Sequence, residues 1–258
     1  TYFVGINEVF WEAAQIGRKQ LAELKTLAEA GWGDSEFNVR ELAEHGWTRL
    51  GVLPIIFNPN QHNNRPDRKV LRQWQGGVNI LFVGRIVPNK RLEDVILTFY
   101  YFKHFVCPEA RLFLVGSTAG MERYFNFLQA LVKRLDLSDV IFAGHVTTAQ
   151  WLAYYQCGSI YLSMSEHEGF GIPLLESMHF GLPIIAYKAA AIAETLGGSG
   201  ILVKIKDHAA IAELIGLVLE DENLRTEIVA RQRERLRDFL PIKIEPQLRQ
   251  LLQTLGLQ

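Results

Sequence analysis

The feature that most constrains the fold is a regular alternation of strand-like and helix-like segments that begins at Val78. Short apolar runs are separated by helical stretches as far as residue 219. Strands that alternate with helices in this way are typical of a parallel sheet covered on both faces. The sequence therefore predicts an α/β fold, a Rossmann-like doubly wound parallel sheet plus a partial second domain. The expected strands span 79–83, 111–115, 140–143, 160–163, 183–186 and 200–203, and the expected helices 91–105, 121–135, 148–156, 173–180, 190–196 and 207–219.

The residues before this alternation have a different texture. Apolar residues at near-helical spacing predict a helix over 6–31 that stops near Gly31. A second helix fits 35–44, with Asp34 or Ser35 as its cap. Residues 49–56 are interpreted as a buried strand, and 57–75, rich in Asn, Pro, Arg and Gln, as an inter-domain linker. After the alternation, we expect a charged helix over 222–239 and an amphipathic one over 245–256.

The bulk composition is that of an ordinary globular protein. The 258 residues are enough for one large α/β domain, or for one domain and part of another. Apolar residues make up 48% and charged residues 21%, which allows a sizeable core. Because the net charge is −1, no overall field attracts nucleic acid or an anionic membrane. An anionic ligand must instead be held by a few local cations.

The cysteines and the chain start bear on the compartment. Cys107 and Cys157 have no CxxC partner and no histidine at metal-ligand spacing, so we expect two buried reduced thiols and a cytoplasmic protein. The longest apolar runs are strand-length, well short of the roughly 20 residues of a membrane helix. The first residues lack an initiator Met and a signal-peptide pattern, which leads us to expect a processed or engineered fragment.

The first candidate site is the loop 83–90, between an expected strand and an expected helix. Gly84 would let a ligand approach the backbone closely. Arg85 and Lys90 place two cations near the carboxyl end of the strand, where ligands of such sheets bind. They predict a phosphate site or, alternatively, are solvated surface charges. The GxGxxG fingerprint and the Walker lysine motif are both absent here.

The second candidate site is the loop 165–176, which is denser in chemistry. Gly169 and Gly171 leave backbone N–H groups uncovered, and Pro173 suits the first position of a helix. The helix start then offers a cradle for an anion or sugar hydroxyls. Glu168 and Glu176 flank this cradle, and each carboxylate can accept hydrogen bonds from a vicinal diol. The alternatives are a solvated loop acid at 168 and a favourable helix-start charge at 176, but these do not explain the glycines and the proline.

The two glutamates, with Gly-Phe-Gly-Ile-Pro-Leu-Leu between them, resemble the EX7E motif of retaining GT-B glycosyltransferases, and in particular of the large GT4 family. The resemblance covers roughly 78–220 in order. Met164 and Arg91 depart from it, because many members have Pro and Gly there. Residues 33–38 and 52–55 resemble the last βα unit of the family's acceptor-binding domain, whose earlier strands are missing from this chain. Further matching segments are Val83-Gly84-Arg85 with Lys90, Leu114-Val115-Gly116, Phe142-Ala143-Gly144, Gly181 to Ala186, and Ala193-Glu194 ahead of Gly200 to Val203.

The resemblance implies the domain organisation and the donor-site roles. Residues 1–63 would be the remnant of the acceptor-binding domain and linker, 64–240 the nucleotide-sugar-binding domain, and 241–258 a carboxy-terminal helix. Arg85 and Lys90 would neutralise the donor diphosphate, Glu176 would hold the ribose and Glu168 would contact the transferred sugar. Residues 144–146 would border the base, although His145 is alternatively a solvated histidine. The implied donor-binding residues are Gly84, Arg85, Lys90, His145, Val146, Glu168, Gly169, Phe170, Gly171, Ile172, Pro173, Leu174 and Glu176, with Arg85, Lys90 and Glu168 also assigned to catalysis.

The activity implied is the transfer of a hexose, with retention, from a nucleoside-diphosphate sugar to an unidentified acceptor. A UDP- or GDP-sugar is the expected donor, without a cofactor or nucleic acid. Because no DxD occurs, a metal-bridged diphosphate is not expected, and a metal site at 166–168 is disfavoured. The fragment is expected to bind donor without transferring the sugar, and the missing domain to mediate any peripheral membrane association.

Three other interpretations stay open from the sequence. One is a nonhydrolysing nucleotide-sugar epimerase of the same architecture, against which the EX7E pattern argues. Another is a nucleotide-sugar-binding module without transferase activity. The third is a Rossmann oxidoreductase, which the missing glycine fingerprint disfavours.

Overall fold

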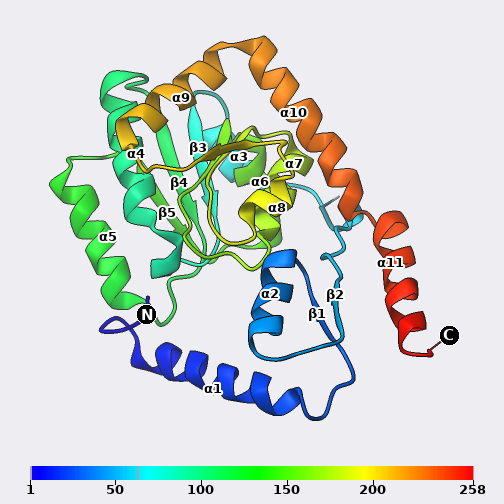
Figure 1. Ribbon diagram of the computed structural model, residues 1–258. Helices are drawn as coiled ribbons and strands as arrows, with labels where there is room; N and C mark the ends of the chain where they lie inside the picture. The colour runs from blue at the N-terminus through cyan, green and yellow to red at the C-terminus, as the bar shows by residue number, and fades with distance from the viewer. Residues whose placement is uncertain (1, 63, 258) are drawn as a thin grey trace.

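A six-stranded parallel sheet forms the centre of the computed structural model, which describes residues 2–62 and 64–257 (Figure 1). The strand order is β5-β4-β3-β6-β7-β8. The chain therefore enters at β3 in the middle, runs outward to β5, and returns to pair β6 against β3. The predicted doubly wound parallel sheet is confirmed. The strands are β3 (Asn79–Val83), β4 (Arg111–Val115), β5 (Val140–Gly144), β6 (Ile160–Ser163), β7 (Ile184–Tyr187) and β8 (Ile201–Val203).

Helices cover both faces of this sheet, as the apolar strands require. In β3, Ile80 and Phe82 face one hydrophobic cluster, whereas Leu81 and Val83 face the other. All but Val83 are almost fully buried, and burial of each such side chain contributes roughly 1.5–3 kcal/mol to the stability of the fold. The first cluster is covered by α4 (Leu92–Phe105), α5 (Glu122–Arg134) and α9 (His208–Glu220), and the second by α3 (Arg68–Trp74), α6 (Thr148–Cys157), α7 (Ile172–Phe180) and α8 (Ile192–Leu196), with α10 (Glu222–Leu236) contributing to both.

A small amino-terminal module lies below the sheet domain in Figure 1. It comprises α1 (Glu8–Leu24), β1 (Gly31–Gly33), α2 (Glu36–Glu44) and β2 (Leu50–Val52), with β1 and β2 paired in parallel. The last helix, α11 (Pro241–Thr254), returns to this module, where Leu251 packs against Gly51. Short 3₁₀ turns lie at Pro59–His62, Pro88–Lys90 and Arg237–Phe239.

Three sequence expectations for the residues before the sheet domain were wrong. The helix expected over 6–31 ends at Leu24, and Gly31 begins strand β1 instead of stopping the helix. Glycine is required there, because a Cβ at Gly31 would lie 2.6 Å from the Trp47 ring. The strand expected over 49–56 is only three residues long. The expected linker contains helix α3, whose cap Asp67 accepts hydrogen bonds from two backbone N–H groups.

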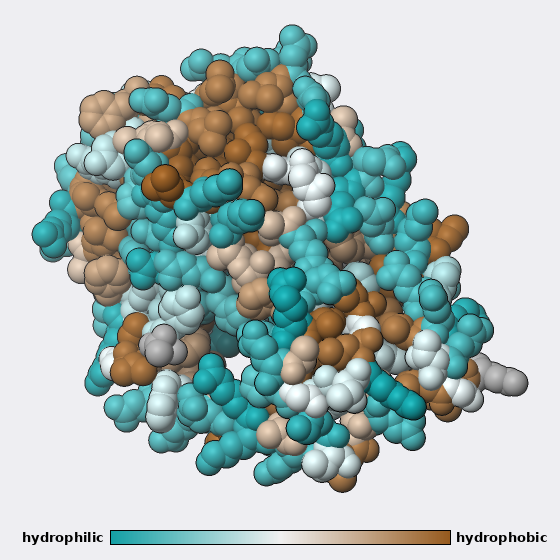
Figure 2. Space-filling model, in the orientation of Figure 1, coloured by the Kyte–Doolittle hydropathy of each residue, from teal (hydrophilic) through white to brown (hydrophobic). Residues whose placement is uncertain are grey.

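The surface of the molecule is mostly polar, with local apolar areas. Figure 2 shows apolar residues around α9, where Ile205 and Leu217 are among the exposed large side chains. Helix α1 has no buried residue, and Val9, Ile16 and Leu27 are exposed along or just after it. Cys157 is buried and Cys107 is partly buried, both as free thiols. Within residues 2–62 and 64–257, no helix combines the length and apolarity needed to cross a membrane.

Candidate donor site

The two loops singled out by the sequence meet at the switch point of the sheet. One follows β3 and the other follows β6, and these strands are neighbours although 76 residues lie between the end of β3 and the start of β6 in the chain. The connections after these two parallel strands run to opposite sides of the sheet. This leaves a crevice between the carboxyl ends of the strands, where ligands of such sheets bind. The topology therefore brings Gly84, Lys90 and Glu168 to one edge.

The first loop is held by the loop after β4. Gly84 N–H donates to the Val115 carbonyl at 2.9 Å, and Ile86 N–H donates to the Ser117 carbonyl at 2.9 Å. Gly116 approaches so closely that a Cβ there would lie 1.8 Å from the Gly84 carbonyl oxygen. No side chain fits at Gly116 without displacing the loop. Gly116, from the segment Leu114-Val115-Gly116 noted in the sequence, thus packs directly against Gly84.

Lys90 and Glu168 form an ion pair across the two loops. The Lys90 ammonium lies 2.5 Å from a Glu168 carboxylate oxygen, and both side chains are largely buried, at 18% and 16% exposure. Each is thus pre-placed by the other. The sequence assigned Lys90 to phosphate and Glu168 to sugar, and the pair puts both groups within reach of a single sugar–phosphate linkage.

The loop after Glu168 presents backbone N–H groups. Gly171, at φ 91°, caps helix α7, and Pro173 is the second helical residue, one position later than predicted. In the described part of the chain, no acceptor meets the N–H groups of Gly169, Phe170 or Gly171. The positive end of the α7 dipole lies behind these groups, which favours an anion or a hydroxyl oxygen.

The conformation of this cradle is fixed by its own buried ends. The Phe170 ring is 5% exposed and lies in the core, while its carbonyl accepts a hydrogen bond from the Thr195 hydroxyl. Leu174 is buried in the same cluster, and Ile172 is exposed toward solvent. The side chains thus anchor the loop, and the backbone is left to contact a ligand.

Glu176 lies deeper, on helix α7. Burial raises its pKa from 4.5 to about 7, and the Tyr155 hydroxyl, which donates to the carboxylate at 2.7 Å, only partly opposes this. Burial and the charges of Glu168 and Glu176 raise the pKa of Tyr161 well above 10. The Tyr161 hydroxyl donates to the Val83 carbonyl at 3.3 Å. Both glutamates therefore lie near the buried Tyr161 phenol of β6, whose hydroxyl reaches the last residue of β3.

Within the described ranges of the chain, Arg85 makes no contact with the Lys90–Glu168 pair. It is exposed, and its guanidinium stacks over the ring of Phe10 from helix α1 at 4.9 Å. Among the residues described, no carboxylate forms an ion pair with it. A guanidinium that rests on an aromatic ring keeps its hydrogen-bond donors for an anion.

His145 and Val146 follow β5, two strands from β3. His145 is exposed, whereas Val146 packs partly against the core. The structure places both at the same edge as the other candidates but gives no contact between them and the Lys90–Glu168 pair. Their proposed role beside the base remains a prediction.

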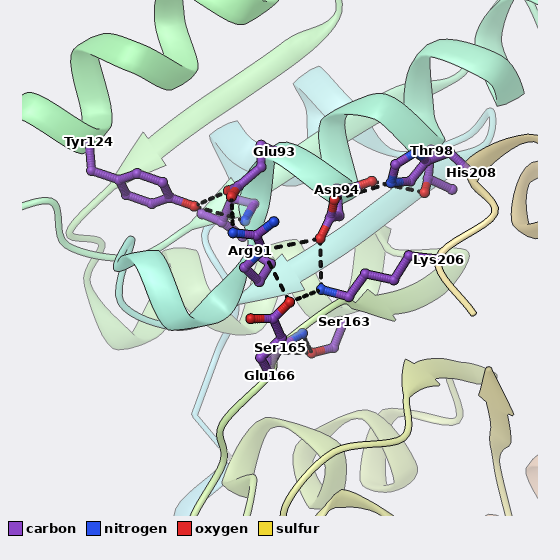
Figure 3. A network of polar contacts seen from close by, with 11 residues as sticks. Arg91, Glu93, Asp94, Thr98, Tyr124, Ser163, Ser165, Glu166, Lys206 and His208 are labelled. Atoms are coloured by element: carbon purple, nitrogen blue, oxygen red, sulfur yellow. Dashed lines mark hydrogen bonds and ion pairs between the residues drawn. The ribbon is translucent and has the colours of Figure 1, made fainter. Parts of the chain in front are cut away.

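The sequence missed a network of ion pairs beside the site (Figure 3). Arg91, in the left-handed conformation at φ 51°, contacts Glu93, Asp94 and Glu166 at 3.0–3.4 Å. Such a conformation costs a non-glycine residue on the order of 1–3 kcal/mol. Lys206 contacts Asp94 at 2.7 Å and Glu166 at 2.8 Å. The side chains of residues 166–168 diverge, because Glu166 turns to this network and Glu168 turns to Lys90.

Electrostatics hold this network in its charged form. Burial of Asp94 opposes its ionisation, but hydrogen bonds from His208 and Lys206 and the charges of Lys206 and Arg91 lower its pKa to about 2. Arg91 was noted in the sequence as a departure from the usual Gly. Its ion pairs are the physical reason that an arginine is accommodated there.

The amino-terminal module also reaches the site. The Ser35 hydroxyl and the Asn38 side-chain amide donate to the Gly169 carbonyl at 3.1 and 3.0 Å. The Glu194 carboxylate accepts from the Glu36 and Phe37 N–H groups, the first of α2, at 2.6 and 3.3 Å. Ser35 is the cap of α2, one of the two capping residues predicted. No sequence motif predicts these contacts, because they join segments more than 130 residues apart.

Comparison with known proteins assigns the family. Residues 64–235 match the family described as "Glycosyl transferases group 1". The chain is 32% identical over 186 residues to D-inositol 3-phosphate glycosyltransferase of Acidothermus cellulolyticus, covering 69% of this chain and 41% of that protein. It is 35% identical over 149 residues to N-acetyl-alpha-D-glucosaminyl L-malate synthase of Bacillus anthracis, covering 56% and 37%. The chain thus spans about two fifths of the length of these relatives.

The fold is shared with solved glycosyltransferase structures. Anabaena Alr3699/HepE, solved in complex with UDP and glucose, superimposes with a TM-score of 0.77 at 20% identity, covering 92% of this chain and 67% of that one. Sucrose-phosphate synthase from Thermosynechococcus elongatus gives a TM-score of 0.74 at 22% identity, covering 92% and 62%. At these identities the likeness shows the fold alone, a GT-B architecture.

Proposed function

This chain belongs to the glycosyl transferases group 1 family, and from that premise we propose that it carries the donor site of a retaining hexosyltransferase. The donor is a nucleoside-diphosphate sugar, with UDP or GDP as the nucleotide. HepE, which shares the fold, was solved with UDP and glucose. The acceptor is a glycan, a lipid or a small molecule.

One observation carries this proposal. The Lys90–Glu168 ion pair lies at the switch point, beside a loop with three backbone N–H groups that meet no acceptor among the described residues, and Glu176 lies on the helix that follows this loop. A cation, an N–H cradle and two carboxylates match a ligand that has a sugar on each side of a diphosphate. In this assignment Lys90 contacts the diphosphate, Glu168 the transferred sugar and Glu176 the ribose.

The chemistry follows from charge development. Breaking the sugar–phosphate bond builds positive charge on the sugar and negative charge on the departing diphosphate. Lys90, Arg85 and the start of α7 stabilise the diphosphate, and they are in place before the reaction begins. Glu168, held against Lys90, lies where positive charge grows. The acceptor attacks from the face that the diphosphate leaves, and the departing phosphate takes the proton of the acceptor.

The test of this assignment uses the ribose. Glu176→Ala is expected to lose affinity for the nucleoside diphosphate, whereas binding of the 2′,3′-dideoxy analogue barely changes, because the lost partners are the two hydroxyls. Comparing two ligands on two proteins isolates that pair. If calorimetry shows equal losses for both ligands, Glu176 does not hold the ribose.

The acceptor side is the part of the reaction that these residues do not supply in this proposal. In this proposal the 258 residues bind the donor without transferring its sugar, because they do not hold the acceptor against it. Holding two reactants in attack geometry can account for ~7–11 kcal/mol of a barrier. Comparing this chain with a full-length relative, on one labelled donor and a mixed acceptor pool, tests the point, and equal transfer rates would contradict it. The cytoplasmic location and the peripheral membrane association stay predictions.

A further inference from the structure

The residues on either side of Lys90 contact the two residues that precede Glu168. Glu166 N–H donates to the Asn89 carbonyl at 2.9 Å, and the Asn89 side-chain amide donates to the His167 carbonyl at 3.1 Å. On the other side of Lys90, the Arg91 guanidinium lies 3.4 Å from the Glu166 carboxylate. Both chain neighbours of Lys90 are therefore tied to the segment that leads into Glu168.

A third segment ties this arrangement to the far side of the sheet. Lys206 follows β8, the last strand in the sheet order, and its ammonium bridges Asp94 of helix α4 and Glu166. The Lys206 ammonium also lies 4.6 Å from the centre of the Tyr187 ring. His208 completes the surroundings of Asp94 at 3.1 Å. Figure 3 shows Arg91, Asp94, Glu166 and Lys206 converging from three loops and a helix.

These four side chains, called here the Arg91 clamp, lie next to the donor residues but do not include them. Arg91 holds a backbone conformation that favours glycine, and it does so while it contacts three carboxylates. A conformation of this kind persists only where the surroundings hold it in place. A glycine would adopt this conformation without steric strain, whereas the arginine adopts it together with the ion pairs of its side chain.

We propose that the Arg91 clamp is a positioning device that fixes the loop bearing Glu168 against Lys90, and thereby sets affinity for the diphosphate and sugar of the donor. This rests on the proposed function, since the donor is the ligand that the pair would meet. The nucleoside end is held elsewhere, by Glu176 on helix α7. The clamp should therefore affect one end of the donor and not the other.

The experiment measures binding of a nucleotide series by calorimetry. Wild type is first titrated with UDP-glucose, GDP-mannose and ADP-glucose, and the tightest binder defines the series of monophosphate, diphosphate and sugar nucleotide. Arg91→Gly removes the guanidinium and suits the backbone, so the variant should fold. Glu166→Gln removes the negative charge that both Arg91 and Lys206 contact. Glu227→Gln is the control, because Glu227 forms an exposed ion pair with Arg231 on α10, away from the site.

The expected result is a split along the ligand. Both clamp variants should bind the sugar nucleotide and the diphosphate at least tenfold more weakly, while monophosphate binding changes less than twofold. The control should match wild type for all three ligands. Equal losses for all three ligands would overturn the proposal and make the clamp a support of folding, and unchanged affinities in both variants would also overturn it. If wild type binds none of the sugar nucleotides, the proposed function itself fails.

Discussion

Replacing Glu176 by Gln is expected to stabilise the protein, and to do so more at pH 8 than at pH 5. Burial raises the pKa of Glu176 from 4.5 to about 7. Below pH 4.5 the carboxyl is protonated in both the folded and the unfolded chain, so its stabilising effect is fully present. Between pH 4.5 and pH 7 the unfolded chain ionises first, and stability is lost until the folded pKa is passed. Gln does not ionise and keeps an acceptor for the Tyr155 hydroxyl.

The size of the effect follows from the two pKa values. At 1.36 kcal/mol per pKa unit, the loss is limited to roughly 3 kcal/mol, most of which falls between pH 5 and pH 8. Urea unfolding of wild type and Glu176→Gln across this range should show the advantage of the variant growing by that amount. Glu227→Gln, at an exposed position, should show no such growth. A variant advantage that is constant from pH 5 to pH 8 would refute the reasoning.

Substitutions at four further positions have defined outcomes. Arg85→Ala and Lys90→Ala should each weaken nucleoside diphosphate binding about tenfold or more but leave nucleoside binding nearly unchanged, because charge-assisted hydrogen bonds are worth roughly 1.5–3 kcal/mol; equal losses in calorimetry would contradict this. Gly116→Ala should lower the melting temperature and abolish nucleotide binding, because its Cβ would lie 1.8 Å from the Gly84 carbonyl oxygen; normal melting and binding would disprove the close approach. Glu194→Ala should lower the free energy of unfolding, measured in urea, by about 0.5–2 kcal/mol, because the Glu194 carboxylate accepts from the first two N–H groups of α2 as a helix cap does. Glu194→Gln should lower it less.

The sheet domain was predictable because the local sequence of each segment indicates its secondary structure. All six expected strands are present within one residue at each end, since each is a short apolar run bounded by turn residues. The amino-terminal module was predicted less well. Gly31–Gly33 carries no strand signal, and it is a strand because β2 pairs with it and the Trp47 ring packs against it.

The site divides in the same way. Lys90, Glu168 and Glu176 could be singled out as candidates because loops at strand ends and a helix start carry recognisable residues. The structure adds the Lys90–Glu168 ion pair, which the sequence could not give, because it depends on β6 pairing beside β3. Lys206 lies 116 residues after Lys90 and has no motif around it, so only the folded chain shows that its ammonium reaches Glu166.

The central claim, a nucleotide-sugar donor site on this chain, is tested most directly by ligand-dependent unfolding. Wild type and the Lys90→Ala/Glu176→Ala double variant are each heated with UDP-glucose, GDP-mannose or ADP-glucose. We expect one of these donors, at 100 times its dissociation constant, to stabilise wild type by about 2.7 kcal/mol and to leave the double variant unchanged. Stabilisation of both proteins to the same extent, or of neither by any of the three donors at millimolar concentration, would contradict the claim.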